Sequence, residues 1–405
     1  MNNHKKYWLT VIGINEDGIS GLSQDARSHI ENAELVIGGA RHLELAKDLI
    51  TGKSEIWQSP IERTIEQIMR PTACHRPLTT VLASGDPFCY GIGATLNRFI
   101  PIDEMLVIPA PSCFSLAAAR LGWALQDTVT IGLNGRALEK IIPHLQPNAK
   151  IMALSTDETT PHLLMELLKK RGFDEIKFLV LEHLGGEKER IVEFKEEDNY
   201  ARLNMIALEI MENSAGNIIP ISSGIDDSFF EHDGQLTKRE IRAITLSSLA
   251  PKRGQLLWDI GLGAGSIAIE WMLHNSSNRA IGFEKIPERA ERAKRNAINL
   301  GVPDLRIIEG SVPDSLREIE APDAIFIGGG AGNPKVIETA WSALKKGGRM
   351  VINSVTVETE ATILAAYKKY GGDIIRIGIE RSEAVGTMTG LRPAMSVLQW
   401  SVVKY

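Results

Sequence analysis

Short runs of β-branched and apolar residues alternate along the chain with stretches whose apolar positions recur every three or four residues. Runs of this kind are typical of buried strands, and the longer periodic stretches are typical of helices. In the first half we expect strands at 7–14, 33–37, 80–83, 105–108, 150–154, 177–181 and 204–210, and helices at 22–33, 115–121 and 161–171. Strands that alternate with helices imply mostly parallel sheets with crossover helices, an α/β fold.

The second half repeats this alternation and predicts a doubly wound, Rossmann-like sheet. Its expected strands are 256–260, 280–283, 306–308, 324–327, 350–353 and 397–402, and a helix at 287–300 begins with Pro287, a favoured first helical residue. Thr237 and Glu240 have the spacing of a capping box, which predicts a helix start there.

The length of 405 residues predicts two or three domains. Residues 211–227 contain Asn, Gly, Pro and Ser without a helical period, which indicates a linker. We therefore expect a bilobal α/β domain at 1–213, a linker at 214–226 and a second α/β domain at 227–405.

Composition excludes several classes of protein. The net charge of −6 disfavours a nucleic-acid binder, which usually needs a basic face. Cys74, Cys89 and Cys113 form no CxxC pair, so we expect neither a metal site nor disulfides. The amino terminus lacks the apolar segment of a signal peptide, and no apolar run approaches the ~20 residues that span a membrane. We expect a cytoplasmic protein that forms a homo-oligomer.

A glycine turn follows the strand at 256–260. Asp259 is followed by Gly261, Gly263 and Gly265, and glycine lets a ligand approach the backbone closely. The dinucleotide fingerprint G-x-G-x-x-G fails because its sixth position is a serine. The spacing is instead similar to that of S-adenosylmethionine (SAM)-dependent methyltransferases. By this similarity Glu284, 19 residues after Gly265, would bind the ribose hydroxyls of SAM. The alternative is a tight turn beside a surface glutamate.

Two further loops lie at the same predicted sheet edge. Ser311 follows the third strand, where adenine usually contacts this fold. Gly328, Gly329 and Gly330 follow the fourth strand, where methyl acceptors usually approach, although a triple glycine is also typical of a flexible loop. Asn353 ends the fifth strand, where it either binds substrate or caps a turn.

Three loops of the first half follow predicted strands and are expected to converge at one crevice. Taken alone, the sequence SGDP indicates only a turn. The candidate ligand-binding residues in these loops are Gly13, Ser84, Gly85, Asp86, Ser112 and Cys113.

Together these segments resemble two known families. VIGINEDGISGLS, ASGDPFCYGIG, PAPSCFSLAAARLGW and LEHLGGEKER are similar to the tetrapyrrole (corrin/porphyrin) methylases, in the branch acting at corrin carbon 5. EHDGQLTKREIRA, WDIGLGAGSIAIEW, IFIGGGAG and INSVTVETE resemble the carbon-15 precorrin methyltransferases, which also decarboxylate. The resemblance implies two SAM sites, two methyl transfers and loss of carbon dioxide from the ring-C acetate, on the route to cobalamin. The first site would use Gly13, Ser84, Gly85, Asp86, Ser112 and Cys113. The second would use Asp259, Gly261, Gly263, Gly265, Glu284 and Ser311.

Some positions depart from the family pattern: Cys113, Asn134, His183 and Ser311 stand where serine, histidine, asparagine and aspartate are common.

Because the implied substrate is a polycarboxylate, arginines near the crevices are candidate anchors. We name Arg239 and Arg392, with a solvated surface charge as the alternative for each. His232 is a weak candidate acid or base, as is Asn353, and no catalytic base is assigned.

Two other functions stay open at this point. An RNA methyltransferase would show salt-sensitive RNA binding, against which the acidic balance argues. A non-catalytic tetrapyrrole carrier would fail to bind SAM, against which the glycines and Glu284 argue.

Overall fold

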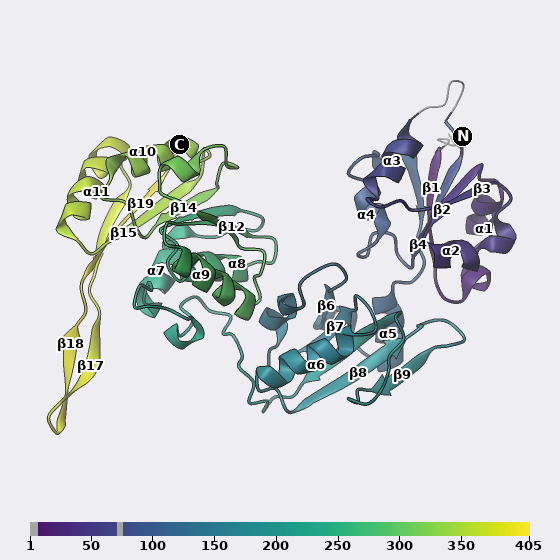
Figure 1. Ribbon diagram of the computed structural model, residues 1–405, viewed down its shortest axis with the longest axis horizontal. Coiled ribbons are helices and arrows are strands. Elements are labelled where there is room, and N and C mark those ends of the chain that lie inside the picture. The colour runs from purple at the N-terminus through teal and green to yellow at the C-terminus, as the bar shows by residue number, and fades with distance from the viewer. Residues whose placement is uncertain (1–6, 71–75) are drawn as a thin grey trace. The chain divides into compact units, whose positions relative to one another are not determined.

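The computed structural model describes residues 7–70 and 76–405, so Cys74 and the first six residues lie outside the described part. The chain forms two compact units (Figure 1). The first holds residues up to 136 together with 147–216, and the second holds 137–146 together with 217–405.

The first unit opens with a parallel five-stranded sheet in the order β3-β2-β4-β1-β5. Its strands are β1 (Leu9–Ile14), β2 (Leu35–Gly38), β3 (Lys53–Ile56), β4 (Thr79–Ser84) and β5 (Met105–Ile108). Helices α1 (Gln24–Glu31) and α2 (Ala40–Leu45) cover one face, and α3 (Glu62–Met69) and α4 (Ile92–Leu96) the other (Figure 1). β1 is buried along its whole length, as expected of a central parallel strand.

The same unit contains a second sheet, in the order β6-β7-β10-β8-β9. Its elements are β6 (Thr128–Gly132), β7 (Lys150–Leu154), β8 (Ile176–Glu182), β9 (Arg190–Glu193) and β10 (Asn204–Ile210), with helices α5 (Cys113–Leu121) and α6 (Thr160–Lys170). Helix α5 packs against this sheet. β10 runs antiparallel to both β7 and β8, so the expectation of mostly parallel strands is wrong here.

The second unit is built on a seven-stranded sheet in the order β13-β12-β11-β14-β15-β19-β16. Its strands are β11 (Leu256–Ile260), β12 (Arg279–Glu284), β13 (Arg306–Glu309), β14 (Ala324–Ile327), β15 (Arg349–Ser354), β16 (Asp373–Ile377) and β19 (Val397–Val403). β19 runs antiparallel to both of its neighbours, β15 and β16, and the other neighbouring pairs of this sheet are parallel. Its helices are α7 (Arg239–Leu249), α8 (Ser266–Leu273), α9 (Pro287–Asn299), α10 (Pro334–Ala343) and α11 (Val357–Tyr370), of which α10 and α11 cover one face.

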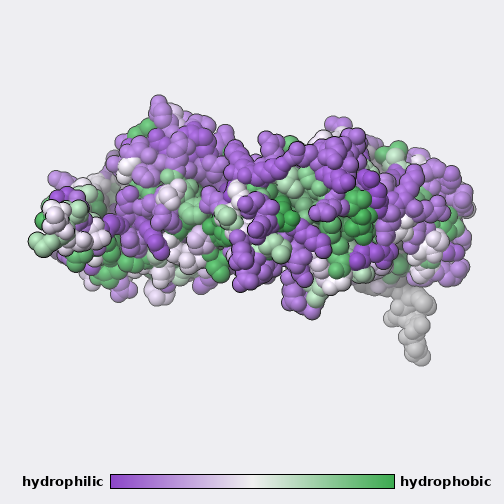
Figure 2. Space-filling model, turned by 90° about the horizontal axis from the view of Figure 1, so that it is seen from below, coloured by the Kyte–Doolittle hydropathy of each residue, from purple (hydrophilic) through white to green (hydrophobic). Residues whose placement is uncertain are grey.

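A two-stranded hairpin, β17 (Glu380–Val385) and β18 (Met388–Pro393), extends away from this sheet (Figure 1). Three of its apolar side chains are exposed: Val385 at 62%, Met388 at 75% and Leu391 at 68%. Seen from below, apolar and weakly polar residues gather at the left end of the surface, where the hairpin lies (Figure 2).

A 3-10 helix from the first half of the sequence, Leu138–His144, belongs to the second unit. A Cβ on Gly301, after α9, would lie 2.4 Å from Pro143 Cδ, so the two segments are in close contact. Lys140 forms an ion pair with Asp304, and the Gln146 side chain donates to the carbonyl of Ile219 at 2.9 Å.

Every strand and helix whose range the sequence predicted is present, with ends shifted by at most two residues. The capping box is wrong. Helix α7 begins at Arg239 after Lys238, which makes no side-chain cap, and Glu240 pairs with Arg381 instead. The carbonyl of Thr237 accepts from Arg242, so the backbone here is fixed by a buried guanidinium rather than by a capping hydroxyl. Within the described ranges, no helix is long and apolar enough to cross a membrane.

A buried ion pair between α7 and α8 holds the segment that precedes α7. Arg242, fully buried, pairs with Glu270 of α8, which is 2% exposed. Glu270 also accepts from the amides of Gly224, at 2.7 Å, and Ile225, at 3.1 Å. Because each charge is met by hydrogen bonds, the pair fixes the path of the chain that enters this unit.

We expect Glu270→Ala to lower the free energy of unfolding by about 3–5 kcal/mol, because it leaves buried Arg242 with only the carboxylate of Asp227, at 3.2 Å, and leaves the amides of Gly224 and Ile225 without an acceptor. The matched control is Glu320→Ala, which breaks an exposed pair with Arg279 and should cost about 0–1 kcal/mol. Chemical denaturation of both variants measures the difference. Equal losses would contradict the structural role of the buried pair.

Candidate binding sites at two sheet edges

In the first unit, three loops meet at the carboxyl ends of β1, β4 and β5. A Cβ on Gly13 would lie 1.8 Å from the carbonyl oxygen of Gly85 and 2.6 Å from the amide of Ala110, so only glycine fits. The Ala110 amide donates to that same carbonyl at 3.2 Å. Gly85 has a φ of +54°, a conformation that favours glycine. The convergence predicted for these loops is confirmed.

The other predicted residues of this edge surround the glycines. Asp86 accepts from the amide of Phe88 at 2.8 Å and so closes its own turn. Ser112 caps α5 by accepting from the amide of Ser115 at 3.1 Å. Burial raises the pKa of the Cys113 thiol to about 11, so this group is neutral at pH 7.

Sequence reasoning missed a polar cluster beside Ser84, at the same edge. Arg41 and His42, on α2, lie 2.9 Å and 2.8 Å from the Ser84 hydroxyl. Arg41 also pairs with Glu16, whose carboxylate receives a hydrogen bond from His183 Nδ1 at 2.8 Å. Burial opposes ionisation of Glu16, but the hydrogen bonds from His183 and Arg41 outweigh it and lower its pKa. The rule that polar residues after a strand mark a site also applies to Arg41 and His42, which follow β2.

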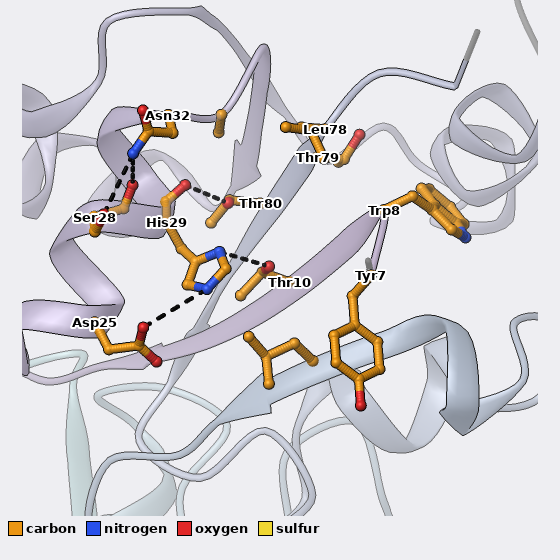
Figure 3. A pocket seen from close by; sticks show the side chains of 12 residues that line it. Tyr7, Trp8, Thr10, Asp25, Ser28, His29, Asn32, Leu78, Thr79 and Thr80 are labelled. Carbon is orange, nitrogen blue, oxygen red and sulfur yellow. Dashed lines mark hydrogen bonds and ion pairs between the residues drawn. The ribbon is translucent and has the colours of Figure 1, made fainter. Parts of the chain in front are cut away.

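A cavity of about 450 Å³ lies elsewhere, beside α1 and the amino-terminal part of β1 and β4 (Figure 3). Several of its polar side chains are already paired: His29 contacts the Thr10 hydroxyl at 3.3 Å and Asp25 at 3.8 Å. Ligands bind beyond the carboxyl ends of parallel strands, so this cavity is not the site that the loops form.

In the second unit, the glycine turn after β11 lies directly against the loop after β14. A Cβ on Gly261, where φ is +77°, would lie 2.6 Å from the amide nitrogen of Gly329. Gly263 has a φ of +58° and its missing Cβ faces the carbonyl of Gln235 at 3.3 Å. At Gly265, with a φ of +80°, the close neighbour is Ala293 of α9, at 3.2 Å. All three predicted glycines therefore occupy positions where a side chain is costly.

Two buried carboxyl groups lie at this turn. Asp259 accepts from the amide of Ala268 at 3.0 Å, but its Oδ1 has no hydrogen-bond partner within the described chain. Burial raises the pKa of Asp259 to about 8, and the charge of Glu284 adds to the effect. Glu284 accepts from the amides of Gly263, at 2.9 Å, and Lys285, at 3.0 Å.

The remaining loops of this edge adjoin the turn. The amides of Gly328 and Gly329 both bond to the carbonyl of Ile260, and Gly330 lies against Val312, one residue after the exposed Ser311.

Both polar atoms of the Asn353 side-chain amide are hydrogen-bonded. It donates to Thr245 at 2.8 Å and accepts from Gln399 at 2.9 Å, which agrees with a structural role.

Three predicted residues lie on the surface. His232 accepts from the amide of Gly234 at 3.1 Å within a turn. Arg239 is exposed at the start of α7. Arg392 lies on the hairpin, paired with Glu383 at 2.6 Å, and the structure does not bring it to the glycine loops.

Comparison with known proteins matches both units. Residues 9–198 fit the family of tetrapyrrole (corrin/porphyrin) methylases and residues 228–404 the precorrin methyltransferase domain. A Sinorhizobium sp. protein named precorrin-6Y C(5,15)-methyltransferase [decarboxylating] is 49% identical, covering 98% of this chain and 96% of the relative. The chain belongs to this family.

Other members of the precorrin-6Y C(5,15)-methyltransferase family agree. One from Mycobacterium tuberculosis (strain CDC 1551 / Oshkosh) is 36% identical over 98% of this chain and 100% of its own. A crystal structure of the C-terminal domain of precorrin-6Y C5,15-methyltransferase from Rhodobacter capsulatus is 40% identical, covers 46% of this chain and all of its own, and has a TM-score of 0.44.

Methyltransferases of this family imply SAM as the methyl donor, and the second unit suits it. SAM carries an ammonium and a sulfonium charge, and the unpartnered Oδ1 of Asp259 is a buried carboxyl oxygen that can accept from the ammonium, whose charge would favour the ionised form of this group. Oε1 of Glu284 already accepts from the amides of Lys285 and Ile286, whereas Oε2 accepts only from Gly263 and keeps a further lone pair for a ribose hydroxyl. The glycines leave the space that a Cβ would fill.

We expect Gly261→Ala to weaken SAM binding at this turn at least tenfold, about 1.4 kcal/mol, because the new Cβ displaces the loop at Gly329. Gly347→Ala is the control. Gly347 has the same φ of +77° but no atom within 4 Å of its missing Cβ, so the change should only reduce stability by about 1 kcal/mol. Calorimetric titration with SAM distinguishes them, and equal affinities would contradict the steric argument.

The raised pKa of Asp259 predicts how stability depends on pH. Between about pH 4 and 8 the folded protein holds a proton that the unfolded chain has released, so the contribution of this group falls as pH rises, by up to about 1.4 kcal/mol per unit. Asp259→Asn should remove this part of the dependence. Urea unfolding of both proteins across this range measures it, and parallel curves would show that Asp259 does not titrate as predicted.

Proposed function

We propose that the chain transfers methyl groups from SAM to carbons 5 and 15 of a precorrin and removes carbon dioxide from the ring-C acetate, in cobalamin biosynthesis. Full-length similarity to the named relatives is the observation that carries this proposal. The presence of two separate glycine-lined sheet edges supports two donor sites.

Each unit would carry one activity. We assign methylation at carbon 5 to residues 1–213, which contain the tetrapyrrole methylase match, and methylation at carbon 15 with decarboxylation to 227–405. Residues 214–226 would connect the two activities. Gly13, Ser84, Gly85, Asp86, Ser112 and Cys113 would hold the first donor, and Asp259, Gly261, Gly263, Gly265, Glu284 and Ser311 the second.

The chain would position the donor and the acceptor and would exclude water. SAM supplies an activated methyl group when bound, so the chain need not provide a metal or a covalent nucleophile. Glu284 would orient the ribose and Asp259 would face the positive charge, while the loop Gly328–Gly330 would admit the macrocycle. Alignment of the acceptor carbon with the methyl group is the main catalytic requirement.

Mass measurement tests the proposal. Purified chain with methyl-labelled SAM and precorrin-6Y should give a product that has gained two methyl groups and lost one carbon dioxide. Glu284→Ala should retain only methylation at carbon 5, because the contact to the SAM ribose in the second unit is lost. The control is Glu309→Ala, at the paired register position on β13, where the exposed side chain should leave both steps intact. A wild-type product without added methyl groups would refute the function. Unchanged carbon-15 methylation in Glu284→Ala would refute the role of Glu284 at the ribose.

We also propose a cytoplasmic homo-oligomer, assembled through the β17–β18 hairpin. A lone two-stranded hairpin is marginally stable in water, and this one exposes Val385, Met388 and Leu391. A second copy of the chain that covers these side chains would account for both features.

Charged substitutions on the hairpin should dissociate the assembly. Met388→Lys combined with Leu391→Lys would place two like charges in the covered surface, so sedimentation should shift toward the monomer. Leu364→Lys, on the 47% exposed side chain in α11, is the control and should leave the mass unchanged. A wild-type chain that sediments as a monomer would contradict the proposal.

A further inference from the structure

The cluster beside Ser84 is built from three segments of the first unit. Arg41 and His42 come from α2, Glu16 from the loop after β1, and His183 from the end of β8. Side-chain exposure is 36% for Arg41 and 17% for Glu16, so the cluster is half-buried and still open to a ligand. The comparisons assign these residues no role.

Hydrogen-bond chemistry fixes the tautomer of His42. Its Nε2 lies 2.9 Å from Arg41 Nη2, which can only donate, and 2.8 Å from the Ser84 hydroxyl. Nε2 must therefore accept, and the ring proton lies on Nδ1. Burial and the neighbouring guanidinium lower the pKa of His42 to about 4, so the ring is neutral at pH 7. Its Nδ1 is buried and has no hydrogen-bond partner among the described residues.

The donors of the cluster that a ligand can reach belong to Arg41. This guanidinium has five N–H groups and makes three hydrogen bonds, to Glu16, Ser84 and His42. The Nδ1–H of His42 is buried and faces no ligand. A partly exposed guanidinium with unused N–H groups can bind a carboxylate, which is the anionic group common to both expected ligands.

The cluster touches the donor loops at Ser84 but lies to one side of their glycines. In the sheet order β3-β2-β4-β1-β5, Gly13, Gly85 and Ala110 meet over β4, β1 and β5. Arg41 and His42 instead follow β2, on the other side of β4. A group bound there lies beside the donor pocket rather than inside it. A macrocycle with carboxylates on its rim is wide enough to reach this place while one of its carbons faces the methyl group.

We propose that Arg41 binds a rim carboxylate of the tetrapyrrole acceptor during methylation at the first site, with His42, Glu16 and His183 as positioning residues. This inference rests on the proposed function. The amino-acid end of SAM also carries a carboxylate, and the experiment distinguishes binding of that group from binding of the precorrin.

The first test compares two arginines of equal exposure. Arg76, like Arg41, is 36% exposed and pairs with a carboxylate, Glu104, at 2.9 Å. In full-length protein, Arg41→Met should raise the KM for precorrin-6Y in carbon-5 methylation at least tenfold and change the SAM dissociation constant less than twofold. Arg76→Met should change neither. Circular dichroism checks that both variants fold. If Arg41→Met does not fold, Arg41→Lys takes its place in the test.

The second test uses the ring nitrogen that accepts from Arg41. His42→Ala removes the Nε2 acceptor that orients the guanidinium and should raise the same KM, whereas His42→Gln keeps an acceptor near that position and should restore part of the loss. Unchanged KM in Arg41→Met and His42→Ala would overturn the inference, as would weakened SAM binding with an unchanged precorrin KM. Wild-type protein without carbon-5 methylation would refute the proposed function instead.

Discussion

Close approach of two backbone segments, possible only where a side chain is missing, is the constraint on which both sites depend. At Gly13 a Cβ would lie 1.8 Å from a carbonyl oxygen of the neighbouring loop, and at Gly261 it would lie 2.6 Å from an amide nitrogen. In each unit the strands end together and the loops must cross at that end. Glycine removes the steric conflict and leaves a surface of backbone groups, against which a flat or extended ligand can lie.

The two edges differ in electrostatics although they share this geometry. The second presents the buried carboxyl groups Asp259 and Glu284, of which Asp259 keeps an unpartnered oxygen, so it suits a cation. The first presents spare N–H groups of Arg41, so it suits an anion beside the donor loops. One family of reaction can use both, because a methyl donor is positive at sulfur and a precorrin is negative at its rim.

Sequence periodicity predicted which segments form strands and helices, and the glycine turns predicted where loops converge. It did not predict that β10 runs antiparallel to its neighbours, because pairing direction is a property of two segments together. Asn353 was predicted to bind substrate or cap a turn, and its partners Thr245 and Gln399 are distant in sequence. Arg392 was chosen for its charge alone, and it belongs to a hairpin that no periodic signal distinguished.

The boundary between the units in sequence is not their boundary in space. Residues 137–146 precede the last strands of the first unit, but they pack against Gly301 and pair with Asp304 of the second. A cut in the chain between the two family matches would take this segment away from α9 and expose the surface that Pro143 covers. Loss of an activity in such a fragment would therefore reflect the missing segment as well as the missing unit. For this reason single substitutions in the full chain, which leave that packing intact, are the sharper way to separate the two methylations.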